Sequence, residues 1–304
     1  MPFQAFLTGG GEMGDRIRAH DWTATPLGPP QGWPASLRVA LALCLQSSFP
    51  TAIYWGPELI LLYNDAWSTI PGPRHPGALG RPAREVWADI WDVVEPQLAA
   101  VRATRTGFST IDEFLPMQRH GRPEETYWDY SFTPIIDEQG GVCGVFNQGR
   151  EVTARVLQSR RDRFLSELDD ALRGGADGGR VLDQGLALIG RTIGVDRAGF
   201  AEIDAEANEI AVLRCWTNGL ADISGRYPLD MFGTGVTERL SAGGIVRLND
   251  LEDPLLGSAD ARAAHRAIGI EAGLAAPLVR AGQFEAALFV HAARPREWTD
   301  HKAE

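Results

Sequence analysis

The sequence has 304 residues, enough for two domains of about 150 residues each. Its net charge of -11 argues against binding to nucleic acid or to an anionic membrane surface, because both need clustered lysine and arginine. The chain is 44% apolar and has no run of about 20 consecutive apolar residues, so it predicts a globular protein without a membrane span.

The cysteines and the N-terminus indicate the compartment. Cys44, Cys143 and Cys215 lie far apart and form no CxxC pair, as expected of a protein from a reducing compartment. The N-terminal stretch MPFQAFLTGGGEMGDR has neither the basic region nor the long apolar region of a secretory signal. We therefore expect a cytoplasmic protein.

The first half of the chain holds seven of the nine tryptophans and predicts an α+β domain. A helix is predicted over residues 34–46, and the runs PTAIYWG and ELILLYN predict a strand hairpin that turns at Gly56-Pro57. Helical spacing follows over residues 84–104, where Pro96 is expected to kink or break the helix. Turn signals then separate the strands FSTIDEFLPMQ, EETYWDYSFTPIID and VCGVFNQG. The result is a five-stranded antiparallel sheet with a helical insert.

A continuous helix is predicted over residues 150–173. Leu157, Phe164, Leu168 and Ala171 repeat at coiled-coil spacing, with Arg161 on the same seam. A dimer-forming connector and a plain amphipathic helix both fit this pattern.

The rest of the chain is richer in Ala, Gly and Leu, which indicates a second, differently built core. It predicts a helix over 180–194, the strands VDRAGFAEID and NEIAVLRCWTNG, helices over 236–244 and 258–269, and a hairpin from EAGLAAPLVRAG to FEAALFVHAARP. The last residues, WTDHKAE, predict the start of a helix. We interpret this end as the break point of a longer protein, or as a short capping helix.

Motifs for catalysis are missing from the sequence. Residues 9–14, GGGEMG, match the spacing of a dinucleotide-binding loop, but prolines follow where a second strand is needed, so we interpret them as a flexible glycine-rich lead-in. No HExxH pair, nucleophile elbow, P-loop or His/Cys pair at metal spacing occurs. We therefore expect neither an enzyme nor a metal site.

The aromatic stretch YWGPELILLYNDAW carries more information. Its side chains alternate between strand faces, and they can line a cavity or fill a core. Asn64 is expected to cap a short helix that carries Trp67. Cys215 fits an inert core position as well as a reactive one. The candidate pocket residues are aromatic side chains of the first half together with polar or sulfur side chains near predicted strands: Tyr54, Tyr63, Asn64, Trp67, Trp87, Trp91, Tyr127, Phe146, Cys215, His265 and His291.

The hairpin ending in Asn64-Asp65-Ala66, the helical insert and the strands ending in VCGVFNQGREVT together resemble a PAS domain over residues 49–153. A lead-in with one helix over residues 1–48 precedes it. That lead-in, GEMGDRIRAHDWTATPLGPPQGWPASLRVAL, followed by WGPELILLYNDAW, resembles the N-terminal sensory region of bacterial sensor histidine kinases, often of the HWE type.

In residues 154–304, the paired helices, the two strands after them and IGIEAGLAAPLVRAGQFEAALFVHAARPREWT resemble a connector helix followed by a GAF domain. The order of the two domains and the stretch HAARPREWT are also similar to phytochromes. The sequence departs from them, because it has no cysteine before the PAS-like region and no Pro-x-Ser-Asp-Ile-Pro bilin-contact motif. It also lacks the Asn-Cys-Arg-Phe-Leu-Gln-like loop of flavin light sensors.

The resemblance implies a sensory input module of two-component signalling. An unknown small molecule or another signal would act on a PAS or GAF pocket, and no cofactor is required by the sequence. A homodimer formed through residues 150–173 and the C-terminal helix would pass the signal to a histidine kinase, whose motifs this chain lacks. The alternatives are a bilin-, flavin- or haem-binding photosensor or redox sensor that uses Cys215, His265 or His291, and a regulatory segment of a diguanylate cyclase.

Overall fold

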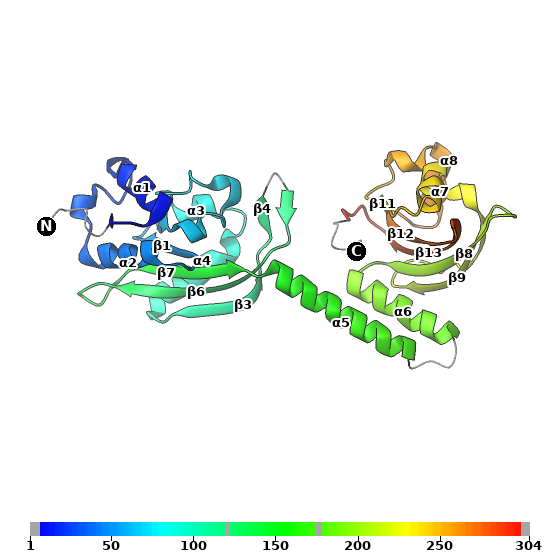
Figure 1. Cartoon of the computed structure of the whole chain (residues 1–304), viewed down its shortest axis with the longest axis horizontal. Helices are drawn as coiled ribbons and strands as arrows, with labels where there is room; N and C mark the ends of the chain where they lie inside the picture. The colour runs from blue at the N-terminus through cyan, green and yellow to red at the C-terminus, as the bar shows by residue number, and fades with distance from the viewer. Residues whose placement is uncertain (1–6, 120–121, 174–177, 299–304) are drawn as a thin grey trace. The chain divides into compact units, whose positions relative to one another are not determined.

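The computed structural model describes residues 7–119, 122–173 and 178–298. The chain divides into two compact units, residues 1–159 and 160–304. Each unit is built on its own antiparallel sheet, and the chain runs from blue to green through the first unit and from green to red through the second (Figure 1). The predicted α+β class is therefore confirmed. None of the described helices is both long and apolar enough to cross a membrane.

The first unit has a five-stranded antiparallel sheet with helices packed on it. Its elements are α1 (Gly11–Ala19), α2 (Ala35–Gln46), β1 (Thr51–Trp55), β2 (Ile60–Tyr63), α3 (Ala83–Val86), α4 (Trp91–Thr104), β3 (Phe108–Phe114), β4 (Met117–Arg119), β5 (Arg122–Glu124), β6 (Tyr127–Ile136) and β7 (Val142–Glu151). The strand order is β2-β1-β7-β6-β3, and α3 and α4 are inserted between β2 and β3. This arrangement confirms the predicted sheet and its helical insert.

The predicted break at Pro96 is wrong. Helix α4 continues through Pro96, which costs the helix only the hydrogen bond to the carbonyl of Asp92. The helical segment is interrupted instead between α3 and α4, where the chain leaves the helical path at Trp87. The buried indole of Trp87 donates a hydrogen bond to the Tyr54 hydroxyl over 3.1 Å, so tertiary packing sets the position of the break.

The hairpin of β4 and β5 was not predicted. The long strand expected over FSTIDEFLPMQ ends at Phe114, and β4 begins a separate two-stranded sheet at Met117. Pro116 lies between the two strands and has no N–H to donate to a ladder.

The glycine-rich lead-in is also different from the expectation, because it opens helix α1. The backbone N–H groups of Glu12 and Met13 donate to the Asp65 carboxylate over 3.1 and 2.6 Å. A Cβ atom at Gly11 would lie 1.8 Å from an Asp65 carboxylate oxygen, and Gly11 has a φ of 58°. The glycine is therefore needed for the helix N-terminus to close on Asp65.

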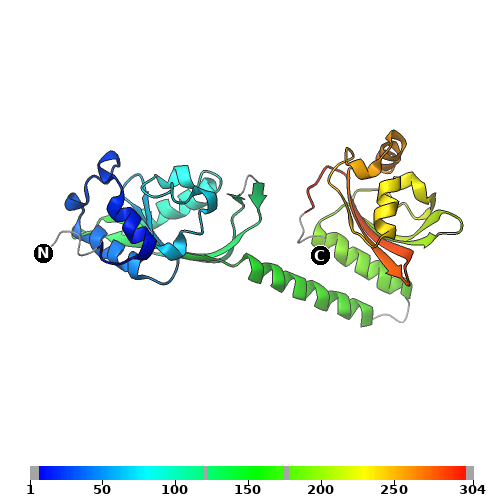
Figure 2. The same ribbon diagram turned by 45° about the horizontal axis from the view of Figure 1, so that its top comes forward.

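The second unit is a six-stranded antiparallel sheet between two layers of helices. Its elements are α6 (Gly178–Ile193), β8 (Arg197–Asp204), β9 (Glu209–Thr217), β10 (Gly225–Pro228), α7 (Thr234–Ser241), β11 (Val246–Leu248), α8 (Ala259–Ala267), β12 (Ala272–Arg280) and β13 (Gln283–Ala292). The strand order is β10-β9-β8-β13-β12-β11. Helix α6 covers one face, whereas α7 and α8 lie over the other (Figures 1 and 2). The helices predicted at 180–194, 236–244 and 258–269 and the central strands are confirmed, and the short edge strands β10 and β11 are additions.

Helix α5 (Thr153–Arg173) joins the two units. It starts three residues later than predicted, because β7 continues to Glu151 in register with Trp128. The predicted seam is half-buried at Leu157, Phe164, Leu168 and Ala171 and exposed at Arg161. The helix predicted from WTDHKAE lies at residues 299–304, outside the described part of the chain.

Candidate functional site

The first unit has a cavity between its sheet and the inserted helices. The sheet contributes Tyr54, Tyr130, Phe132 and Asn147, which strand alternation places on one face. Trp67, Trp87, Ile90 and Val94 close the opposite side, and Leu115 and Met117 come from the segment around β4. The space open to the centre of a water-sized sphere is about 50 Å³, enough for a few water molecules.

The polar groups that line this cavity are bonded to other protein groups. The Tyr54 hydroxyl accepts from the Trp87 indole, and the Tyr130 hydroxyl donates to Gln97 Oε1 over 2.7 Å. The Trp67 indole donates to Asn147 Oδ1 over 3.4 Å. Burial raises the pKa of Tyr130 to about 12, so its hydroxyl stays protonated. The cavity is a close-packed aromatic core that leaves little hydrogen-bonding capacity for a ligand.

Eight of the predicted candidates belong to the first unit, and the structure brings three of them together at this cavity: Tyr54, Trp67 and Trp87. The other five do not line it. Tyr63 is fully buried and its hydroxyl bonds to His75 Nδ1 over 3.0 Å. Phe146 lies on the opposite face of β7, Trp91 is half-buried at the start of α4, and Tyr127 packs with Val152 and Val156 near α5.

Asn64 is a structural residue of the first unit. Its Oδ1 accepts from the backbone N–H groups of Thr51 and Trp67 over 3.1 and 3.0 Å. Its Nδ2 donates to the carbonyls of Ser47 and Phe49 over 2.8 and 2.9 Å. The side chain caps the 3₁₀ turn Asp65–Trp67, as predicted, and all its hydrogen bonds serve the fold.

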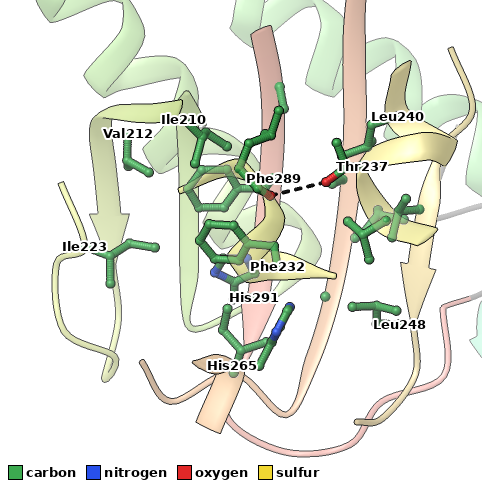
Figure 3. Close-up of a pocket in the computed structure, with 18 of the residues that line it drawn as sticks. Ile210, Val212, Ile223, Phe232, Thr237, Leu240, Leu248, His265, Phe289 and His291 are labelled. Carbon is green, nitrogen blue, oxygen red and sulfur yellow. Dashed lines mark hydrogen bonds between the residues drawn. The ribbon is translucent and has the colours of Figure 1, made fainter. Parts of the chain in front are cut away.

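The second unit has a cavity between its sheet and the layer of α7 and α8. Figure 3 shows its walls, which are almost entirely apolar and include Ile210, Val212, Phe232, Leu240 and Phe289. The space open to the centre of a water-sized sphere is about 80 Å³. A mostly apolar hollow with a few converging polar groups is the usual form of a small-molecule site.

Three polar side chains line this second cavity: Thr237, His265 and His291. The Thr237 hydroxyl donates back to the carbonyls of Leu229 and Gly233, each over 3.3 Å, and a dashed line in Figure 3 starts at this hydroxyl. The imidazoles of His265 and His291, in contrast, each form a hydrogen bond through only one of their two ring nitrogens, as far as the described residues show. His265 Nδ1 lies 2.9 Å from the Ala261 carbonyl, and His291 Nδ1 lies 3.3 Å from Arg197 Nη1.

Family comparisons identify the two units. Residues 47–157 match the profile of the PAS fold, and residues 177–304 match that of the GAF domain. The chain contains a PAS domain followed by a GAF domain. The resemblances to these two families are thereby confirmed, and the larger cavity belongs to the GAF domain.

A search of curated proteins found no match. Among solved structures, the chromophore-binding domain of Stigmatella aurantiaca phytochrome P1 is 16% identical, with a TM-score of 0.41 over 84% of this chain and 89% of that chain. The phycocyanobilin-bound GAF domain from a cyanobacterial phytochrome is 15% identical, with a TM-score of 0.41 over 46% and 84%. Free methionine-R-sulfoxide reductase from Neisseria meningitidis is 14% identical, with a TM-score of 0.36 over 48% and 81%. Similarities this loose carry no argument about ligand or activity.

Arg197 contacts His291 and the loops beside the GAF cavity, and the sequence analysis did not identify it as a candidate. Its side chain is completely buried at the start of β8. Nε donates to the Ala221 carbonyl and Nη2 to the Ile268 carbonyl, each over 2.9 Å, in addition to the contact with His291. The only sequence signal is an arginine among the small and apolar residues of VDRAGFAEID.

Both cavity histidines are uncharged near neutral pH. Burial lowers the pKa of His265. Burial also lowers the pKa of His291 well below its usual range, and the charges of Arg197 and His265 add to that effect. His291 is half-buried and lines the cavity.

Cys215, the remaining candidate, does not line the GAF cavity. It is half-buried in β9 and packs in the apolar cluster of Val212, Ile223 and Phe289. Burial raises the pKa of its thiol, so the thiolate is disfavoured. Among the described residues, no group of three His, Cys, Asp or Glu side chains is placed to hold a metal ion.

Proposed function

We propose that the chain is a sensory input module that binds a small molecule in the GAF cavity and passes the signal through α5. The observation that carries this proposal is the pair of uncharged imidazoles in an apolar cavity, each with its Nε2 atom unbonded to any described residue. Groups of this kind fix the orientation of a ligand in a pocket. The chain acts as a binding module and not as an enzyme.

The start of α5 is tied to the segment that closes the PAS cavity, so a movement of α5 would reach the PAS domain. Met117 lines that cavity, and Arg119 of the same short strand bonds to Glu151 over 2.8 Å. Glu151 also accepts a hydrogen bond from Thr153, the first residue of α5, over 2.7 Å. A shift of β4 would therefore change the contacts that hold the helix start.

The output in this proposal is a histidine kinase, reached through a cytoplasmic homodimer. The half-buried seam of Leu157, Phe164 and Leu168 on α5 is the surface that the two copies would share. A ligand would shift the equilibrium between two helix arrangements only by as much as its affinity for them differs.

Native mass spectrometry and an absorbance spectrum of freshly purified protein test this function. We expect a dimer that carries or takes up a colourless small molecule. A visible absorbance band from bilin, flavin or haem would favour the photosensor or redox alternative. A strict monomer at high concentration, with and without bound compound, would contradict transmission through α5.

A further inference from the structure

We infer that the GAF cavity selects an uncharged ligand that presents a hydrogen-bond donor beside an acceptor, such as a carboxamide, over a carboxylate of the same shape. This inference rests on the proposed function of the cavity. It follows from the tautomers that the surrounding residues impose on His265 and His291.

His265 presents an acceptor to the cavity. Its Nδ1 lies 2.9 Å from the carbonyl oxygen of Ala261, one turn earlier in α8. A carbonyl can only accept, so Nδ1 carries the proton. The ring is uncharged because burial lowers its pKa, and its Nε2 therefore holds a free lone pair. The imidazole is 4% exposed and its ring packs edge-on against Phe232, which lines the same cavity.

His291 presents a donor. Its Nδ1 lies 3.3 Å from Arg197 Nη1, and a guanidinium can only donate, so Nδ1 accepts and the proton of the uncharged ring sits on Nε2. The ring stacks on Phe289 with centroids 4.7 Å apart, which fixes its plane. Both imidazoles line the same cavity, and Figure 3 draws both of them below Phe232.

The apolar lining, the lone pair of His265 and the charge of Arg197 together disfavour charged ligands, the first two acting against a carboxylate and the last against a cation. Every described residue that lines the cavity lacks a formal charge, so an ion would lose its water without a paired partner in this lining. A carboxylate would meet the lone pair of His265 with a second acceptor. A cation would meet the positive charge of Arg197, which lies directly behind His291. A carboxamide satisfies both imidazoles, because its N–H donates to His265 and its C=O accepts from His291.

Three probes with equal numbers of heavy atoms test the inference: isobutyramide, isobutyrate and 3-methyl-2-butanone. The measurement is an NMR titration of the whole chain that follows the methyl groups of Ile210, Val212 and Ile223, which line the cavity. We expect isobutyramide to bind about tenfold more tightly than the ketone, which leaves His265 unpaired, and at least about tenfold more tightly than isobutyrate.

His265→Phe keeps a ring of similar shape and removes the acceptor, so the preference for isobutyramide over the ketone should fall below about twofold. Thr237→Val is the matched control in the same cavity, because the Thr237 hydroxyl is already bonded to backbone carbonyls. This variant should keep the preference.

Isobutyrate binding as tightly as isobutyramide would overturn the inference and leave the cavity as a ligand site. If no probe shifts the cavity methyl groups of the folded protein, the cavity is not a ligand site and the proposed function fails as well.

A spectrum of the wild-type chain tests the inference without any variant. Long-range ¹⁵N–¹H correlation of the histidine rings near neutral pH should show the proton on Nδ1 of His265 and on Nε2 of His291. The opposite tautomer on either ring, or a charged ring, would overturn the inference.

Discussion

Arg197 Nη1 lies 3.3 Å from His291 Nδ1, and the arginine is the partner that must donate. This one contact sets the tautomer of His291 and places a fixed positive charge behind the GAF cavity. The same guanidinium donates hydrogen bonds to the carbonyls of Ala221 and Ile268, so it joins strand β8 to two neighbouring loops.

Replacing the buried guanidinium should destabilise the GAF domain. Arg197→Met leaves the carbonyls of Ala221 and Ile268 without their donor, and we expect the free energy of unfolding to fall by about 2–4 kcal/mol in urea denaturation. Arg214→Met is the matched control, because Arg214 is half exposed and forms only a surface ion pair with Asp183. Its effect should stay within about 0.5 kcal/mol. Equal effects of the two substitutions would contradict the role given to Arg197.

The stability of the GAF domain should fall as the pH drops below about 6.5. The folded-state pKa values of His265 and His291 lie below the usual value, so protonation favours the unfolded chain. Their contribution is complete above the unfolded pKa and is lost as the pH falls towards the folded values, by at most about 1.4 kcal/mol per pH unit for each ring.

Urea midpoints between about pH 7.5 and about pH 5.5 measure this slope. The double variant H265Q/H291Q should have a flatter profile than the wild type, whereas the control H20Q, which lies outside the GAF domain, should keep the wild-type slope of GAF stability. A double variant with the wild-type slope would show that other groups dominate.

Substitution by alanine should change the unfolding free energy in opposite directions at two glycines of α6. A Cβ atom at Gly185 would lie 3.6 Å from Leu168 Cδ1, an ordinary contact, so Gly185→Ala should stabilise the helix by about 0.5–1 kcal/mol. At Gly190 it would lie 2.1 Å from Trp216 Cε3, so Gly190→Ala should destabilise by about 1–3 kcal/mol in spite of its better helix propensity. Urea unfolding measures both changes, and the same sign for both would contradict the packing described for α6.

Asn64 should matter for stability and not for ligand selection. Asn64→Ala removes four hydrogen bonds, and we expect a loss of about 2–4 kcal/mol in the unfolding free energy of the PAS domain. Asn64→Asp keeps the acceptors but turns a carboxylate oxygen towards the carbonyls of Ser47 and Phe49, so it should also destabilise. Asn218→Ala, at an exposed position, is the control and should change little. If Asn64→Asp left the unfolding free energy unchanged, the two hydrogen bonds that Asn64 Nδ2 donates would be unimportant for stability.

Local patterns were enough to predict the order of the main helices and of the long strands. Alternation and turn signals located the hairpin of β1 and β2, and helical spacing located α2, α6 and α8. The errors arose where a distant contact decides the local structure. The break at Trp87 depends on the hydroxyl of Tyr54, and the helix at Gly11 depends on Asp65.

The cavities were harder to predict than the fold. Sequence reasoning placed most candidates among the PAS aromatics, where residue type alone cannot tell a filled core from a hollow. Strand alternation predicts that Phe146 and Asn147 lie on opposite faces of the sheet. It does not predict which face meets the inserted helices, because that depends on how the sheet is assembled. Arg197 was missed because an arginine in a strand is normally exposed, and only the two carbonyls of other segments make its burial tolerable.

The central claim is that the GAF cavity binds a small molecule. A methyl NMR titration with isobutyramide, on the wild type and on Ala287→Leu, tests it most directly. Ala287 is buried in β13 and lines the cavity, so leucine fills the space without adding charge. We predict saturable shifts of the Ile210, Val212 and Ile223 methyl groups in the wild type and at least about tenfold weaker binding in the folded variant. Equal titration curves for the two proteins, or no shift of these methyl groups in the wild type, would contradict the claim.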